Sequence, residues 1–317
     1  MRQRWNHTAR LLARLHLPGL VLLLAAPARA GEPGSVAFTS LRFGTGARYA
    51  GMGDVGVSLA RDANAAYWNP AGLAGIQTTS LALQHNEWMV SIRTETATLA
   101  HATDLGVFGL YFSGMYLDDI ERTTNPSTTP EGTFNVYEIA VQGAYGRSLT
   151  HSDKLGDLDV GLAFKGLFSG LDSDTASGWA VDVGAHLRTQ IPGLTFGAAG
   201  QHLGPKITFI QDPSPLPATL RVGADYQRSA QQYKSDFAVA YDLEVVNDDD
   251  LRNHFGVEWT YARLVSLRGG FKTGFDSQKD GSFGVGVQRG GYHFDYAFTG
   301  VENELGNVHR FSIGIDL

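Results

Sequence analysis

Residues 308–317 read VHRFSIGIDL, and apolar and polar residues alternate along this stretch. One face of it carries Phe311, Ile313, Ile315 and Leu317. The opposite face carries Arg310, Ser312, Gly314 and Asp316. Because successive side chains of a β-strand point to opposite sides, the stretch is predicted to be a strand with one apolar and one polar face.

The same alternation recurs from residue 80 to the end of the sequence. It gives fourteen candidate strands, at 80–86, 89–101, 105–117, 134–149, 157–171, 177–189, 194–203, 217–229, 234–245, 252–262, 264–274, 281–289, 291–299 and 308–317. Outer-membrane barrels have an even number of antiparallel strands, with short turns at one end and longer loops at the other. The two longest connections, 118–133 and 204–216, both follow odd-numbered strands. We therefore predict an all-β fold, a fourteen-stranded antiparallel transmembrane β-barrel at residues 80–317.

A soluble β-sandwich also alternates and is the alternative to a membrane barrel. Its solvent-facing side, however, would carry more lysine, whereas residues 31–317 hold only six lysines. The apolar faces are rich in aromatic residues near strand ends, such as Trp88, Trp179 and Trp259. Aromatic residues in these positions suit the interfacial girdles of a membrane barrel, which is the preferred interpretation.

Composition excludes several classes of protein. The chain has 317 residues with 39 glycines, no cysteine and a formal net charge of −7. Without cysteine it has no disulfides, zinc–thiolate sites or cysteine nucleophile. The acidic balance gives no reason to expect a nucleic-acid partner.

The first thirty residues have the pattern of a secretory signal peptide. Several arginines precede an apolar stretch at 17–26, and small residues at 27–30 suit a cleavage site. The apolar stretch is too short to span a membrane. We therefore predict export through the periplasm to the outer membrane of a Gram-negative-type bacterium, where outer-membrane lipid surrounds the barrel.

Residues 31–79 do not alternate. The segment is glycine-rich but also carries large apolar side chains, such as Val36, Phe38, Leu59 and Trp68, that need cover from water. Because it precedes a barrel, we predict that it forms an N-terminal hatch inside the lumen.

Residues 46–76, GARYAGMGDVGVSLARDANAAYWNPAGLAGI, resemble the N-terminal signature of the FadL-like outer-membrane transporters, and more closely that of their PorV/PorQ branch. The residues singled out as the hatch motif are Gly51, Met52, Gly53, Asn69, Pro70, Ala71 and Gly72. The resemblance implies a fourteen-stranded barrel with an N-terminal hatch. It also implies movement of hydrophobic small molecules across the outer membrane. The alternative that it leaves open is a PorV/PorQ-type interaction partner of a type IX-like protein-secretion system.

Charges of both signs fall on the polar faces of the predicted strands. Those assigned to the lumen include Arg93, Glu95, Asp182, Arg188, Glu258 and Arg268. One interpretation is that they pair and so fill a narrow interior, and the other is that they line a path and select what passes. Mixed signs favour pairing.

The third predicted strand, 105–117, is apolar on both faces. It either packs against the hatch or lines a path for an apolar solute between hatch and wall. In the second case Phe108, Leu110 and Phe112 line the path, opposite the hatch turn at residues 69–71.

The sequence predicts no enzyme. No Ser–His–Asp arrangement has a supporting context, and the acidic runs at 172–174 and 248–250 lack the spacing of a calcium loop. No catalytic residue, metal ligand or cofactor is therefore assigned. The expected partners are outer-membrane lipid and either a hydrophobic ligand or secretion-system proteins.

Overall fold

The computed structural model describes residues 35–88, 91–123, 130–209, 212–249, 251–274, 278–301 and 307–317. The predicted signal peptide at 1–30 and the first residues of the predicted hatch lie outside these ranges. Over the described part of the chain, no helix is both long enough and apolar enough to cross a membrane.

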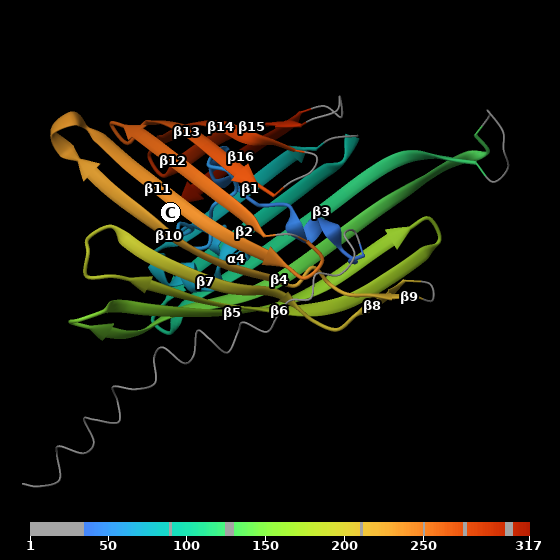
Figure 1. The fold of residues 1–317 in the computed structure, drawn as a ribbon, viewed down its shortest axis with the longest axis horizontal. Coiled ribbons are helices and arrows are strands. Elements are labelled where there is room, and N and C mark those ends of the chain that lie inside the picture. The colour runs from blue at the N-terminus through green and yellow to red at the C-terminus, as the bar shows by residue number, and fades with distance from the viewer. Residues whose placement is uncertain are drawn as a thin grey trace, which may run out of the picture.

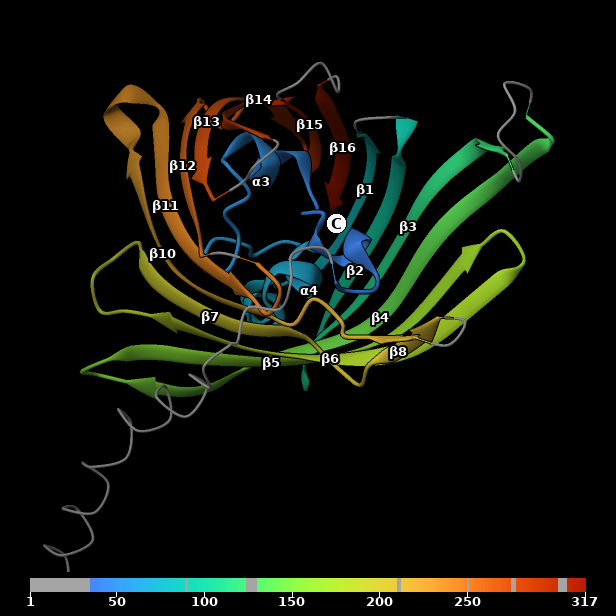
Figure 2. The ribbon, with the colours of Figure 1, turned by 45° about the vertical axis from the view of Figure 1, so that its right-hand side comes forward.

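Fourteen strands of the described chain close into one antiparallel barrel (Figures 1 and 2). They are β1 (Thr79–Glu87), β2 (Arg93–Thr103), β3 (Gly106–Arg122), β4 (Gly132–Ser152), β5 (Gly156–Leu171), β6 (Asp174–Arg188), β7 (Leu194–Leu203), β10 (Thr219–Ala230), β11 (Ser235–Val246), β12 (Arg252–Tyr261), β13 (Val265–Thr273), β14 (Gln278–Arg289), β15 (Tyr292–Val301) and β16 (Val308–Asp316). Strand β1 closes the ring by pairing with β16, so that Leu83 faces Ile313. The predicted fold class is confirmed.

The wall has two distinct ends. At one end, the short-turn end, strands are joined by a few residues, as between β2 and β3 or β12 and β13. The opposite, long-loop end holds the connections between β3 and β4 and between β7 and β10. The second of these contains a separate hairpin, β8 (Ile207–Phe209) and β9 (Asp212–Ser214). A short 3-10 turn, η4 (Gln231–Tyr233), joins β10 to β11 at the short-turn end.

The side chains alternate as the sequence predicts. In β12 the exposed side chains Phe255, Val257 and Trp259 alternate with the buried His254 and Glu258. Apolar side chains thus face outward around the ring, where lipid would cover them, and polar ones face inward.

The wall is uneven in height. Strand β4 has 21 residues, whereas β1 has 9. The β3–β4 hairpin projects beyond the rest of the barrel at the long-loop end (Figure 1). Both strands run past their predicted ends because register irregularities, at Leu117/Ile120 and Ser148/Thr150, interrupt the period-two pattern.

Residues 35–76, here called the lumenal segment, lie inside the ring of strands (Figure 2). The segment contains η1 (Thr39–Arg42), α3 (Ala47–Gly51), α4 (Ala65–Trp68) and η2 (Pro70–Gly75). It begins at the long-loop end, where the Ala37 N–H donates to Pro215 O, and leads into β1 at the short-turn end.

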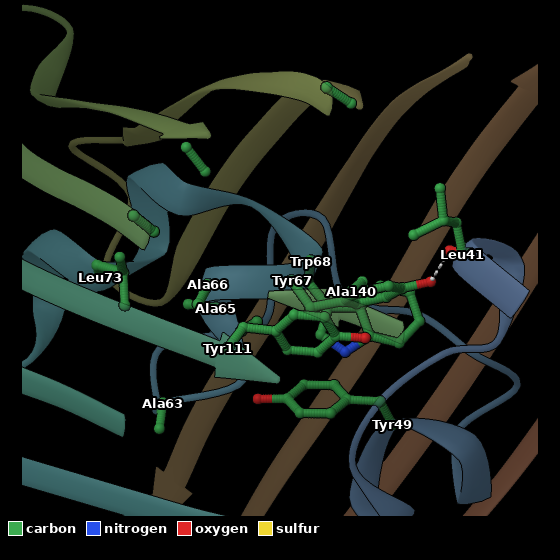
Figure 3. Close-up of a cluster of buried hydrophobic side chains, with 14 of the residues drawn as sticks. Leu41, Tyr49, Ala63, Ala65, Ala66, Tyr67, Trp68, Leu73, Tyr111 and Ala140 are labelled. Atoms are coloured by element: carbon green, nitrogen blue, oxygen red, sulfur yellow. Dashed lines mark hydrogen bonds between the residues drawn. The ribbon is translucent and has the colours of Figure 1, made fainter. Parts of the chain in front are cut away.

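The apolar core lies between the lumenal segment and the inner wall (Figure 3). Tyr49 and Trp68 of the segment are fully buried. Tyr67 packs against Tyr111 of β3, with ring centroids 5.6 Å apart, and its hydroxyl donates to Leu41 O at 3.1 Å. Burial of large side chains by the segment stabilises it inside the barrel rather than in water.

Candidate functional site

A row of inward-facing glycines lines the wall where the lumenal segment passes. This glycine belt comprises Gly146, Gly161, Gly184, Gly197, Gly256, Gly270 and Gly284. A Cβ added at Gly161 would lie 2.1 Å from the carbonyl carbon of Pro70, and one at Gly197 would lie 2.2 Å from Val57 O. The belt therefore lets the backbone of the segment touch the backbone of the wall, which no other residue type would allow.

The first half of the hatch motif, Gly51, Met52 and Gly53, sits against β12, β13 and β14. A Cβ at Gly51 would lie 2.8 Å from the Gly284 Cα. Gly53 has φ +78° and lies so close to the wall that a Cβ would be 2.6 Å from Phe255 O. Met52 between them is fully buried. The glycines of the motif thus permit both a tight turn and close contact.

The second half of the motif, Asn69, Pro70, Ala71 and Gly72, sits against β4, β5 and β6. The Asn69 Nδ2 donates to Val57 O at 2.8 Å, and the Asn69 Oδ1 accepts from the Ala71 N–H at 3.1 Å. Pro70 begins η2, where its missing N–H costs nothing. The two halves of the motif therefore contact different parts of the wall. Asn69 also joins two stretches of the lumenal segment, because it bonds both Val57 and Ala71.

We expect Asn69→Ala to lower the free energy of unfolding by about 1–3 kcal/mol, because it leaves the buried Ala71 N–H without its acceptor and removes one of the two donors to Val57 O. Urea titration of the detergent-solubilised barrel, followed by the gel mobility of the folded form, measures the change. Asn247→Ala, which removes a single donor to Leu216 O, is the control. An equal or smaller effect at Asn69 would contradict this role.

Polar side chains of the wall bind the backbone of the segment, which has little regular structure of its own. Asp242 accepts the N–H groups of Gly56 and Val57 at 2.6 and 2.9 Å. His186 Nε2 donates to Val57 O at 2.7 Å. The other contacts of this kind are His254 to Gly53 O, Gln201 to Tyr67 O and Gln142 to Ala66 O. These contacts satisfy buried backbone groups that would otherwise be unpaired.

The predicted lumen charges Asp182, Arg188, Glu258 and Arg268 are paired. Asp182 lies 2.8 Å from Lys165 Nζ, and both side chains are almost fully buried. Arg188 forms two hydrogen bonds to Asp159, at 2.9 and 3.0 Å. This geometry fits the interpretation that mixed charges fill the interior.

Glu258 and Arg268 also tie the segment to the wall. Arg48 of α3 donates to both oxygens of Glu258, at 3.0 and 2.7 Å, and Arg268 donates to the same carboxylate at 2.6 Å. A second tie joins Asp54 to Lys272 at 2.6 Å and to Arg310 at 2.9 Å. Lys272 and Arg310 are both buried, so Asp54 supplies the negative charge that they share.

Arg93 and Glu95 were predicted to face the lumen, and this is wrong. Their side chains are 53% and 51% exposed on the outer face of β2, where Arg93 pairs with Asp118 and Glu95 with His85. Both lie near the long-loop end of the strand. Beyond the apolar band a charged side chain meets water on either face, so charge does not reveal orientation there.

Phe108, Leu110 and Phe112 also face outward, so they do not line a space between segment and wall. They are 49%, 59% and 37% exposed, whereas Val107 and Tyr111 point inward and are buried. Alternation cannot orient a strand that is apolar on both faces. Phe108 and Leu110 instead line an outer groove of about 490 Å3, with Leu99, Gly143, Tyr145 and Phe164.

Cavities remain between the lumenal segment and the wall at both ends of the described barrel. The cavity at the short-turn end has a volume of about 470 Å3 and is bordered by charged groups including Arg61, Asp62 and Asp295. The cavity at the long-loop end measures about 200 Å3 and is bordered by Trp68, Trp88 and several cations. Among the described residues no three His, Asp or Glu side chains gather closely enough to hold a metal ion.

Comparison by sequence gives two matches. Residues 25–165 match the model of an uncharacterised protein family, UPF0164. A UPF0164 protein of Treponema pallidum (strain Nichols) is 27% identical over 171 residues, which is 50% of this chain and 42% of that protein. The chain therefore spans less than half the length of this curated relative.

Comparison by structure identifies barrels of the same fold. The Pseudomonas putida toluene transporter TodX matches with a TM-score of 0.56 and 14% identity, over 86% of this chain and 96% of that one. The Ralstonia pickettii toluene transporter TbuX matches with a TM-score of 0.51 and 14% identity, over 86% and 97%. The resemblance to FadL-like proteins is thus confirmed at the level of the barrel fold, and the PorV/PorQ branch stays a prediction.

Proposed function

We propose that the chain is an outer-membrane barrel that moves hydrophobic small molecules across that membrane. The observation that carries this proposal is the fold, since nearly the whole of two toluene transporters superimposes on this barrel. The signal-peptide pattern at 1–30 supports export through the periplasm. The outward apolar band supports a barrel surrounded by lipid.

The lumenal segment favours an apolar solute over a water-soluble one. It occupies the lumen from the long-loop end to the short-turn end, and the wall holds it by ion pairs and by hydrogen bonds to its backbone. A barrel filled in this way offers no wide aqueous channel. An apolar solute, unlike a polar one, can also cross by entering the lipid beside the barrel.

The outer groove is a suitable place for such a solute on the lipid side. Its lining is almost entirely apolar, and Gly143 at its floor has open space where a Cβ would be. The wall is thin here, because a Cβ added to the inward face of Gly109 would lie 3.0 Å from Leu73 of the lumenal segment. Only strand backbone therefore separates the segment from the groove.

Filling the groove should slow uptake. We expect Gly143→Phe to reduce toluene uptake by cells that carry the barrel, because the new ring occupies the groove without touching the lumenal segment. Gly269→Phe is the matched control, since Gly269 also faces outward but lies on β13. Uptake of radiolabelled toluene, normalised to folded barrel, is the measurement. Equal uptake by the two variants would rule out the groove, and uptake no greater than in cells without the barrel would rule out the function.

A second candidate function is the PorV/PorQ-type secretion partner. The projecting β3–β4 hairpin favours it, because a strand pair that extends past the barrel presents a surface to other proteins at the long-loop end (Figure 1). Shortening the hairpin by joining Leu117 to Val136, which are paired across it, tests this role. Loss of protein secretion with toluene uptake intact would favour the secretion partner.

A further inference from the structure

The cavity at the long-loop end has the features of a binding site for a small organic anion. We propose that it binds an aromatic carboxylate with a single ring, of which benzoate is the simplest. The cavity has a volume of about 200 Å3 and lies between η1 and the wall, where residues of β10 to β13 and of β16 line it. Thr39, which is exposed, stands at its mouth.

Five Lys and Arg side chains but only two of the described carboxylates border the cavity, and Asp242, Asp248 and Asp249 lie behind this lining. Arg42 and Arg252 at its rim are balanced by Asp249 and, for Arg42, by Asp248 at 3.7 Å. Deeper in, three cations face two carboxylates. Arg221 pairs with Glu244 at 2.5 Å, while Lys272 and Arg310 share Asp54 at 2.6 and 2.9 Å. An anion in the cavity would therefore meet mostly cationic side chains.

Arg221 has N–H groups that can donate hydrogen bonds to a bound anion. Its side chain is 5% exposed, and its Nε and Nη1 have no hydrogen-bond acceptor among the described residues. Arg310 is also buried, and its Nε likewise has no hydrogen-bond acceptor among the described residues. Buried guanidinium N–H groups are costly to leave unpaired, and a carboxylate is their strongest acceptor.

Aromatic rings supply the apolar part of the site. Phe43 and Trp88 are stacked at 4.6 Å on the side of the mouth, and Trp68 lies deeper. Arg310 lies 5.2 Å from the Trp88 ring and Arg221 lies 5.1 Å from the Trp68 ring. A cavity of about 150 Å3 holds benzene, so 200 Å3 has room for one ring with a carboxylate.

The site deepens the proposed function by naming a class of solute that can be captured at the long-loop end. It rests on the proposed function for its role in uptake. The binding itself is a property of the barrel and is tested on the purified protein, whereas toluene uptake is tested on cells. Failure of one test therefore leaves the other standing.

Isothermal titration calorimetry of the detergent-solubilised barrel with benzoate is the test. We expect saturable binding of benzoate, and affinities at least about tenfold weaker for benzyl alcohol, which lacks the charge, and for inorganic phosphate, which lacks the ring. Absence of saturable benzoate binding would overturn the proposal. If phosphate binds as tightly as benzoate, the site does not recognise the aromatic ring. If benzyl alcohol binds as tightly as benzoate, the site does not recognise the negative charge.

A negative charge introduced at the mouth of the cavity tests whether benzoate binds there. We expect Thr39→Glu to weaken benzoate binding about fivefold at low salt, because it places a like charge beside the entering carboxylate. Thr175→Glu is the matched control, since Thr175 is also exposed at the long-loop end but does not border the cavity. Both substitutions are on the surface and should leave the barrel folded. Equal binding by the two variants would place the anion elsewhere and overturn the assignment.

Discussion

Gly161→Ala should destabilise the barrel strongly, because it forces a methyl group into the backbone of the lumenal segment. The added Cβ would lie 2.1 Å from the carbonyl carbon of Pro70 and 2.3 Å from the Ala71 nitrogen, both backbone atoms that cannot rotate away. We expect a loss of about 3 kcal/mol or more in the free energy of unfolding, the upper end of the cost of overpacking. Urea titration of the detergent-solubilised barrel measures it.

Gly143→Ala is the matched control for this prediction. Gly143 lies in the neighbouring strand β4 but faces outward, and a Cβ there meets nothing within 4 Å. We expect its midpoint to stay near that of the unchanged protein, since both substitutions alter strand propensity alike. Equal midpoints for the two variants would mean that the lumenal segment does not rest on Gly161.

Asp182→Ala should produce the second large effect. Lys165 and Asp182 have side chains that are 1% and 0% exposed, and the Asp182 carboxylate also accepts the His202 N–H at 2.7 Å. Removing the carboxylate leaves a buried ammonium without its counter-ion, which costs about 3–5 kcal/mol. The same urea titration measures this loss.

The double variant Lys165→Met/Asp182→Leu separates charge from packing. It removes both ions and keeps similar volume, so we expect it to recover most of the stability that Asp182→Ala loses. If the double variant is no more stable than Asp182→Ala, the stability lost in Asp182→Ala does not come from the unpaired charge of Lys165.

The barrel could be predicted from the sequence because its physical signal is local. In residues 308–317 the polarity of each side chain indicates whether it faces inward or outward. The same holds for the strand that contains Trp259. The prediction failed where that signal is absent. Arg93 and Glu95 lie near a strand end, where water is available on both sides, and Phe108 lies on a strand that is apolar on both faces.

The contacts of the lumenal segment could be predicted only in part. The resemblance singled out Gly51, Gly53 and Asn69, which the structure places against the wall. The glycine belt was not identified, because Gly161 and Gly197 differ from outward glycines such as Gly143 only in what lies opposite them. The excess of glycine was the available signal. Its meaning depends on contacts between residues far apart in the sequence, such as Gly284 and Gly51.

The central claim is that the lumenal segment passes through the barrel against the inner face of the wall. A disulfide tests it directly, since the chain has no cysteine of its own. A Cβ at Gly109 would lie 3.4 Å from the Ala66 Cβ, close to the spacing of about 3.8 Å that a disulfide needs. We predict that Ala66→Cys/Gly109→Cys cross-links on oxidation, as detected by mass spectrometry of the joined peptides, and that Ala66→Cys/Gly143→Cys does not. A folded barrel in which the 66–109 pair stays reduced would contradict the account.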